Sequence, residues 1–180
     1  MQKSFYIVLF CFCYPFNNDL KQARVTEHIA TKSIEYIEEI RKNGDSKFFH
    51  KEKKMVALYE RGLARIDLGK YDEAISDFNN LIDISPKLWI AYFLRGKSFV
   101  LINDPIKALP DFDISIRNGF DSLEAYFYRA ICLYRLDLYD KGLSDFEFIK
   151  DSIHQITDLE NLYDSYIYLG KLYSGFGKFK

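Results

Sequence analysis

Residues 55–88 read MVALYERGLARIDLGKYDEAISDFNNLIDISPKL, and residues 89–122 read WIAYFLRGKSFVLINDPIKALPDFDISIRNGFDS. A third copy, LEAYFYRAICLYRLDLYDKGLSDFEFIKDS, begins at Leu123. The chain therefore repeats itself with a constant step of 34 residues. A period of this length is typical of repeat proteins, in which each unit buries its apolar face against its neighbours.

Three columns of residues keep this register. They are a small residue in the first half of each unit, a small residue in the second half, and a phenylalanine four residues later: Gly62, Gly96 and Ala130; Ala74, Ala108 and Gly142; Phe78, Phe112 and Phe146. Small residues let two helices approach closely, and the large ring fills the space beside them. The columns therefore predict closely packed helices in every unit.

These columns resemble those of the tetratricopeptide repeat (TPR) family, whose unit is a pair of antiparallel helices. The resemblance covers about two-thirds of the chain and implies an all-α fold, an α-α superhelix that forms a right-handed solenoid of helix pairs. The expected organisation is an apolar N-terminal segment at 1–17, an N-terminal helix at 18–44, a linker or helix start at 45–54, TPR units at 55–88, 89–122 and 123–156, and a partial fourth unit at 157–180. Pro110 departs from the pattern, because a proline inside the second helix removes a backbone donor and is expected to kink it.

The N-terminal segment combines Lys3 with an uncharged run from Phe5 to Phe16. Such a run resembles the apolar region of a secretory signal, and it is shorter than the roughly 20 residues that span a bilayer. We expect export or membrane tethering, and therefore a place in the cell envelope or outside the cell. The alternatives are an element that packs on the helical domain, and a cytoplasmic protein.

Composition and motifs argue against several classes of function. The 25 basic and 26 acidic residues give a net charge of −1, which offers no basic face for nucleic acid. The three cysteines and three histidines are too scattered to predict a metal site: Cys11, Cys13, Cys132, His28, His50 and His154. No phosphate-binding glycine loop, HExxH or GxSxG motif is present. The sequence therefore predicts no enzyme, no catalytic residue and no cofactor.

Charged residues also recur at the repeat step. The arginines are Arg61, Arg95 and Arg129, and the aspartates are Asp77, Asp111 and Asp145. The arginines could form a ladder that binds anions, or each could pair with an aspartate between packed helices. We favour pairing, because a repeat must satisfy its polar groups in every copy and a guanidinium forms a bidentate contact with a carboxylate. At least two of the three arginines are expected to contact an aspartate of the series.

In TPR proteins the first helices of the units line a concave groove. Carried over by column, the resemblance places these residues in the groove: Tyr59, Leu63, Ile90, Phe93, Lys97, Phe127, Tyr128, Ile131 and Tyr134, with Val56, Ile66, Val100, Leu101 and Arg135 beside them. TPR domains that hold the acidic tails of chaperones use Lys, Asn and Arg at the positions that are here Tyr59, Leu63, Leu94, Glu124 and Tyr128. Capture of a carboxylate tail is therefore not expected. An apolar groove suits a peptide or an amphipathic helix.

A helix is predicted from Leu20 to Asn43, because apolar residues recur there at steps of three and four. It either lies on the groove or stacks on the first unit as a cap. The main functional prediction is a scaffold that binds another protein. The alternative is a structural subunit or fragment that completes its solenoid by self-association, because the final helix carries apolar residues on more than one stripe: Tyr163, Tyr166, Ile167, Leu169, Leu172, Tyr173 and Phe176.

Overall fold

The computed structural model describes residues 20–42, 47–120 and 122–152. Their elements are all helices: α2 (Leu20–Lys42), α3 (Lys47–Asp67), α4 (Tyr71–Ile84), α5 (Trp89–Leu101), α6 (Pro105–Arg117), α7 (Leu123–Arg135) and α8 (Tyr139–Ser152). None of these described helices is long and apolar enough to cross a bilayer. The apolar run Phe5–Phe16 and the partial unit at 157–180, with its expected apolar surface, lie outside the described residues.

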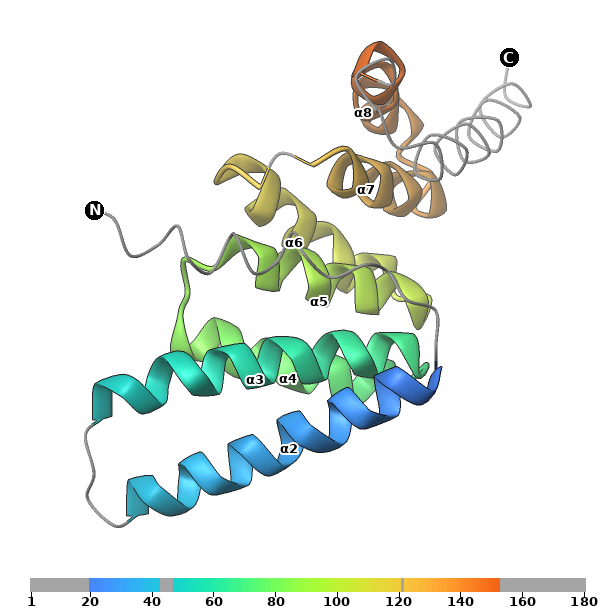
Figure 1. Cartoon of the computed structure of the whole chain (residues 1–180). Coiled ribbons are helices and arrows are strands. Elements are labelled where there is room, and N and C mark those ends of the chain that lie inside the picture. Colours follow the sequence, from blue (N-terminus) through green and yellow to red (C-terminus); the bar gives the residue numbers. More distant parts are fainter. Residues whose placement is uncertain (1–19, 43–46, 121, 153–180) are drawn as a thin grey trace.

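The helices form successive antiparallel pairs that stack into an elongated solenoid (Figure 1). Within a unit, α3 packs on α4, α5 on α6 and α7 on α8, and α4 and α6 also pack on the first helix of the next unit. In Figure 1, α3, α5 and α7 follow one another along the stack, with α4 and α6 behind them. The prediction of an all-α solenoid of helix pairs is confirmed.

Each first helix ends in the same backbone conformation. Gly69, Asn103 and Asp137 have φ values of 72°, 61° and 59°, and they are 34 residues apart. At the first of these turns the Lys70 amide donates to the Arg65 carbonyl at 2.8 Å, a pattern that closes a helix through a left-handed residue. Gly adopts this region without strain, and Asn and Asp are the side chains that tolerate it best. A shared turn therefore reverses the chain in all three units.

The small and aromatic columns meet inside each unit, as the sequence predicts. Phe78 and Phe112 are fully buried, and Phe146 is 1% exposed. A Cβ atom added to Gly62 would lie 2.6 Å from Cε1 of Phe78, and one added to Gly96 would lie 3.0 Å from Cε1 of Phe112. At Gly62 and Gly96 the phenylalanine rings occupy the space that a side chain would need, whereas Ala130 fills this column in the third unit.

Pro110 does not end α6. The helix begins at Pro105, after an N-cap in which the Asp104 carboxylate accepts from the Lys107 amide at 3.2 Å, and it continues to Arg117. Pro110 lies on the exposed side of α6. The backbone group that would have bonded to the missing donor is therefore on the side that water can reach.

The N-terminal helix α2 packs on α3 and extends the stack at its N-terminal end (Figure 1). Its buried stripe consists of Ala23, Ala30, Ile34 and Ile37. Of the two placements that the sequence left open, the structure shows stacking as a cap, and α2 does not pack across α5 or α7. Helix α3 begins at Lys47, so most of the 45–54 stretch belongs to a helix.

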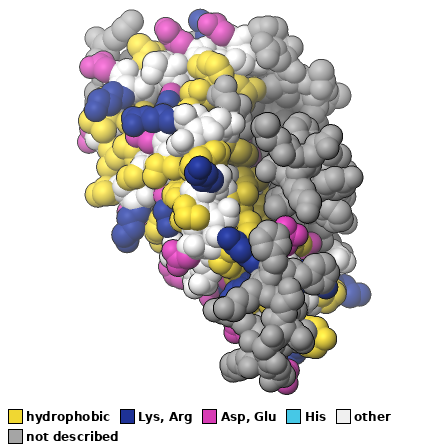
Figure 2. Space-filling view, turned by 90° about the vertical axis from the view of Figure 1, so that its left-hand side faces the viewer, with side chains coloured by type: hydrophobic (Ala, Val, Ile, Leu, Met, Phe, Trp, Pro, Cys, Tyr) yellow, Lys and Arg dark blue, Asp and Glu magenta, His cyan; other side chains and the backbone are white. Residues whose placement is uncertain are grey.

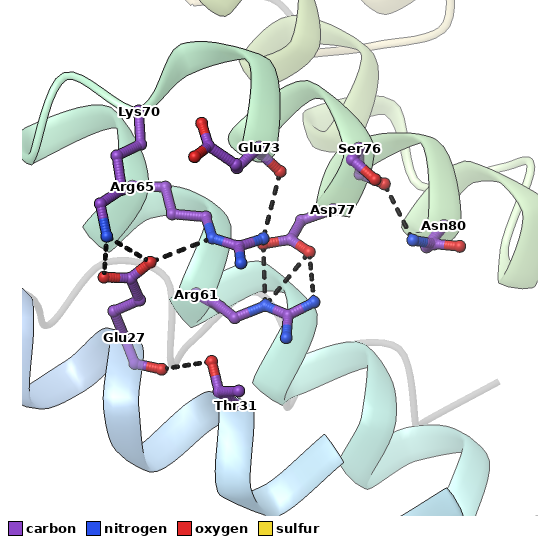
Figure 3. Close-up of polar contacts among 9 residues, drawn as sticks. All are labelled: Glu27, Thr31, Arg61, Arg65, Lys70, Glu73, Ser76, Asp77 and Asn80. Carbon is purple, nitrogen blue, oxygen red and sulfur yellow. Dashed lines mark hydrogen bonds and ion pairs between the residues drawn. The ribbon is translucent and has the colours of Figure 1, made fainter. Parts of the chain in front are cut away.

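A charged network joins α2 to the first unit (Figure 3). The Glu27 carboxylate accepts from Nζ of Lys70 at 2.7 Å and from Nε of Arg65 at 3.3 Å. Nη1 of Arg65 also donates to Oδ2 of Asp77 at 2.6 Å, and Nη2 of Arg61 donates to Oδ1 of Asp77 at 2.6 Å. These contacts fix α2 against the end of α3 and the start of α4.

The stability that Glu27 contributes is expected to depend on pH. Hydrogen bonds from Lys70 and Arg65 lower the pKa of the Glu27 carboxyl. Its contribution is therefore complete above the unfolded-state pKa of about 4.3, and it is lost as the pH falls through the lower folded-state pKa.

We expect Glu27→Gln to lower the free energy of unfolding by about 1 kcal/mol at neutral pH, and to have no effect once the carboxyl is protonated in the folded protein. Urea denaturation at pH 7 and pH 3 measures this, with the exposed Glu39→Gln as control; an equal loss at both pH values contradicts it.

Candidate protein-binding groove

The arginine and aspartate columns form ion pairs in all three units. Arg61 contacts Asp77, as described above, and Nη2 of Arg95 donates to Oδ1 of Asp111 at 2.6 Å. Nε of Arg129 donates to Oδ2 of Asp145 at 2.8 Å. The three aspartates are buried, with exposures of 1%, 3% and 2%. The predicted pairing is therefore confirmed, and these guanidinium groups serve to hold each first helix on its second helix.

Two of these arginines also reach back to the preceding unit. Nη1 of Arg95 donates to Oδ1 of Asn79 on α4 at 2.7 Å, and Nη1 of Arg129 donates to Oδ1 of Asp113 on α6 at 3.0 Å. The sequence analysis missed these bonds, although Asn79 and Asp113 are 34 residues apart and could have been recognised as a column. Each bond fixes the position of one unit relative to the next.

The electrostatics of the Arg95–Asp111 pair show two opposed effects. Burial raises the pKa of the Asp111 carboxyl, and the Arg95 guanidinium acts against that shift. The hydrogen bond to Asp111 in turn raises the pKa of Arg95. Nε and Nη2 of Arg95 each lie within 2.8 Å of an Asp111 carboxylate oxygen, which is the bidentate geometry of a strong ion pair.

The predicted groove residues lie on α3, α5 and α7, and most of them are half-buried. Six of them are apolar side chains that keep part of their surface exposed; we call these six the groove strip: Tyr59, Leu63, Ile90, Phe127, Ile131 and Tyr134. Among the flanking positions, Val56 is 43% exposed and Leu101 is 39% exposed. The strip has two residues on α3, three on α7 and only Ile90 on α5.

Phe93 differs from the groove strip because it is only 4% exposed. Its ring centroid lies 4.9 Å from that of Phe120, 6.1 Å from that of Phe112 and 6.3 Å from that of Tyr128. Tyr128, from the next unit, stacks on Phe112 with an interplanar angle of 9°. These rings therefore join the second and third units, and Phe93 forms the core beneath the groove strip.

Lys97 is the only cation among the nine predicted groove residues. Its side chain is 13% exposed, and its Nζ donates to Oε1 of Glu124 at 2.7 Å. The ammonium also lies 5.4 Å from the centroid of the Tyr128 ring. A charged pair therefore lies between α5 and α7, beside the apolar groove strip, and the Lys97 ammonium also acts against the burial that raises the pKa of Asp67 on α3.

The described surface carries a mixture of side chains. Figure 2 shows the face on the left-hand side of Figure 1, where hydrophobic side chains reach the surface among Lys, Arg, Asp and Glu. This face therefore carries both positive and negative side chains, and neither charge covers it alone. Within residues 20–42, 47–120 and 122–152, no group of three His, Cys, Asp or Glu side chains could hold a metal ion. Burial raises the pKa of the Cys132 thiol to about 12, so this thiol stays protonated at neutral pH.

Comparison with known proteins agrees with this geometry. The tetratricopeptide repeat family model matches residues 56–88, which is the first of the three sequence repeats. No curated protein sequence matches the chain.

Solved structures of similar fold include the first TPR domain of Spaghetti (RPAP3) bound to the HSP90 peptide SRMEEVD, at 20% identity, covering 69% of this chain and 97% of that one, with a TM-score of 0.58. The second TPR domain of human RPAP3, in complex with the HSP70 peptide SGPTIEEVD, is 17% identical, with coverages of 68% and 97% and a TM-score of 0.57. YrrB, a TPR protein with an unusual peptide-binding site, is 18% identical, with coverages of 88% and 78% and a TM-score of 0.55. The first unit is thus matched as a tetratricopeptide repeat, and the described helices through α8 have the fold of the solved tetratricopeptide repeat structures.

Proposed function

We propose that this chain is a non-catalytic interaction protein, and that a peptide or amphipathic helix of its partner binds along the groove strip. The observation that carries the proposal is the partial exposure of apolar side chains at matching positions of α3 and α7, to which α5 adds Ile90. The core of each unit is already filled by Phe78, Phe112 and Phe146, so the strip is additional apolar surface. Apolar clefts rimmed by polar residues are common binding sites for peptides.

The similar structures support a peptide ligand and also limit its chemistry. The two RPAP3 domains bind chaperone peptides that end in acidic residues. In this chain Glu124 and Tyr128 occupy two of the positions at which the clamp of such domains carries cations. The partner is therefore expected to bind through apolar side chains, and SRMEEVD is expected to bind weakly.

The test uses a library of random 12-residue peptides, displayed on phage and selected on the full-length protein. The tightest peptide is synthesised with a fluorophore and titrated by anisotropy. Phe127→Ala combined with Ile131→Ala removes two half-buried side chains of the groove strip, and we expect binding to weaken by about 10- to 100-fold. Ile106→Ala, which removes a 71% exposed side chain from α6, is the matched control. Unchanged affinity in the double variant, with unchanged helicity, would exclude the groove strip as the binding surface.

Self-association is the second candidate, and the last described unit favours it. Leu138, Leu143 and Phe148 are 39%, 44% and 38% exposed, which leaves apolar surface on and beside α8. Sedimentation of the full-length chain over a range of concentrations distinguishes the two. A dimer that dissociates when Leu143 and Phe148 are changed to Glu would support assembly through this end, and a monomer at high micromolar concentration would reject it.

A further inference from the structure

The Lys97–Glu124 pair breaks the apolar pattern of the groove at two positions. The residues that correspond to Lys97 in the first and third units are Leu63 and Ile131, and Glu124 corresponds to Val56 in the first unit. An ammonium group loses favourable hydration free energy when it is buried, whereas a leucine side chain has no such hydration to lose. The repeat fold therefore does not need this pair, and both charges occur at the same junction, between α5 and α7.

Lys97 and Glu124 differ in how deeply their side chains are buried. The Lys97 side chain is 13% exposed, whereas the Glu124 side chain, in the first turn of α7, is 50% exposed. Burial acts against the charge on Lys97, but Glu124 and Tyr128 outweigh it and raise the pKa of the lysine. The cation is therefore fixed in the groove, and its present counter-ion can turn towards water.

We propose that Glu124 occupies the position that a carboxylate of the partner takes on binding. The groove then recognises an acidic side chain placed between apolar side chains, an inference that rests on the proposed function. On binding, the partner's carboxylate replaces Glu124 at the ammonium of Lys97, and the charge of the junction is unchanged. Glu124 regains its hydration and its rotamer freedom as it moves into water. A purely apolar ligand would instead cover the existing pair and remove water from it.

The same geometry rejects basic side chains. A lysine or arginine of the ligand at this position would face the fixed charge of Lys97, and like charges at close range strongly disfavour a wrong partner. The arrangement also differs from capture of an acidic tail, because the clamp positions hold Tyr59, Leu94 and Tyr128. A single cation in an apolar row suits one acidic residue inside a peptide.

The test begins with the same phage library, selected on the wild-type protein and on Lys97→Met. Asp or Glu is expected to be enriched at one position between apolar residues on the wild type only. The best peptide is then made with Glu, Gln or Lys at that position. On the wild type we expect the Glu peptide to bind about tenfold more tightly than the Gln peptide, and the Lys peptide to bind most weakly.

Two variants give opposite expected results. Glu124→Gln removes the internal competitor and should strengthen binding of the Glu peptide by about three- to tenfold. Lys97→Met should abolish the preference for Glu over Gln, and far-UV circular dichroism of the variant shows whether it is folded. Equal binding of the Glu and Gln peptides to the wild type, or no gain in Glu124→Gln, would overturn the inference and leave the groove function standing. Failure of every peptide to bind the wild type would overturn both.

Discussion

Replacing Asp77 by alanine is expected to lower the free energy of unfolding by about 3–5 kcal/mol, the cost typical of removing one partner from a buried ion pair. Asp77 is 1% exposed and accepts hydrogen bonds from both Arg61 and Arg65 (Figure 3). Without the carboxylate, two largely buried guanidinium groups lose their shared counter-ion. Arg65 also holds Glu27, so the attachment of α2 should weaken as well.

Urea denaturation followed by far-UV circular dichroism measures the change. Asp72→Ala is the matched control, because Asp72 is exposed in the first turn of the same helix, and its loss should be within about 1 kcal/mol. Asp77→Asn keeps the size of the side chain and removes its charge, so it should recover only a small part of the loss. A loss below about 1 kcal/mol for Asp77→Ala would show that the ion pair does not determine how the helices pack.

Replacing Phe112 by alanine should have a similarly large effect, about 3–5 kcal/mol, because the ring is fully buried and its removal leaves a cavity. Phe112 fills the space beside Gly96 in its own unit and stacks on Tyr128 of the next unit. Its loss therefore weakens the second unit and the contact between units together. In a repeat protein, the free energy of unfolding is approximately the sum of the stabilities of the units and of the interfaces between them. The substitution should therefore lower the total stability and also loosen the third unit in particular.

Hydrogen exchange measured by mass spectrometry separates these two effects. In the Phe112→Ala variant we expect α7 and α8 to exchange much faster than α3 and α4, because the third unit loses its attachment. Ile106→Ala, on the exposed face of the same helix, should leave the pattern unchanged. Uniform acceleration over all described helices would contradict the division into coupled units.

The sequence predicts the helix pairs well because the repeat copies the interactions that define them. Gly62 and Phe78 recur in register in all three units with one conservative exchange, Ala130, so packing inside a unit can be derived from their spacing. Each arginine and aspartate pair recurs in the same way. A repeated polar contact that must be satisfied in every copy is visible in one sequence.

Contacts between units were harder to predict, because they depend on the angle at which one helix pair packs against the next. The spacing placed Phe93 with Tyr59 and Phe127 in a single column, yet Phe93 alone is buried, since Phe120 and Tyr128 cover it. Whether α2 would lie on the groove or extend the stack also depended on Glu27, whose partners are 38 and 43 residues away in sequence.

In the proposed function, a partner binds along the first helices of the repeats. This binding mode can be tested by hydrogen–deuterium exchange of the full-length protein, with and without the selected peptide at saturation. We predict slower exchange confined to α3, α5 and α7, strongest at the turns of helix that carry Leu63, Lys97 and Ile131, with α4 and α6 unchanged. Slower exchange confined to α4 and α6, or to α8, would contradict binding along the first helices.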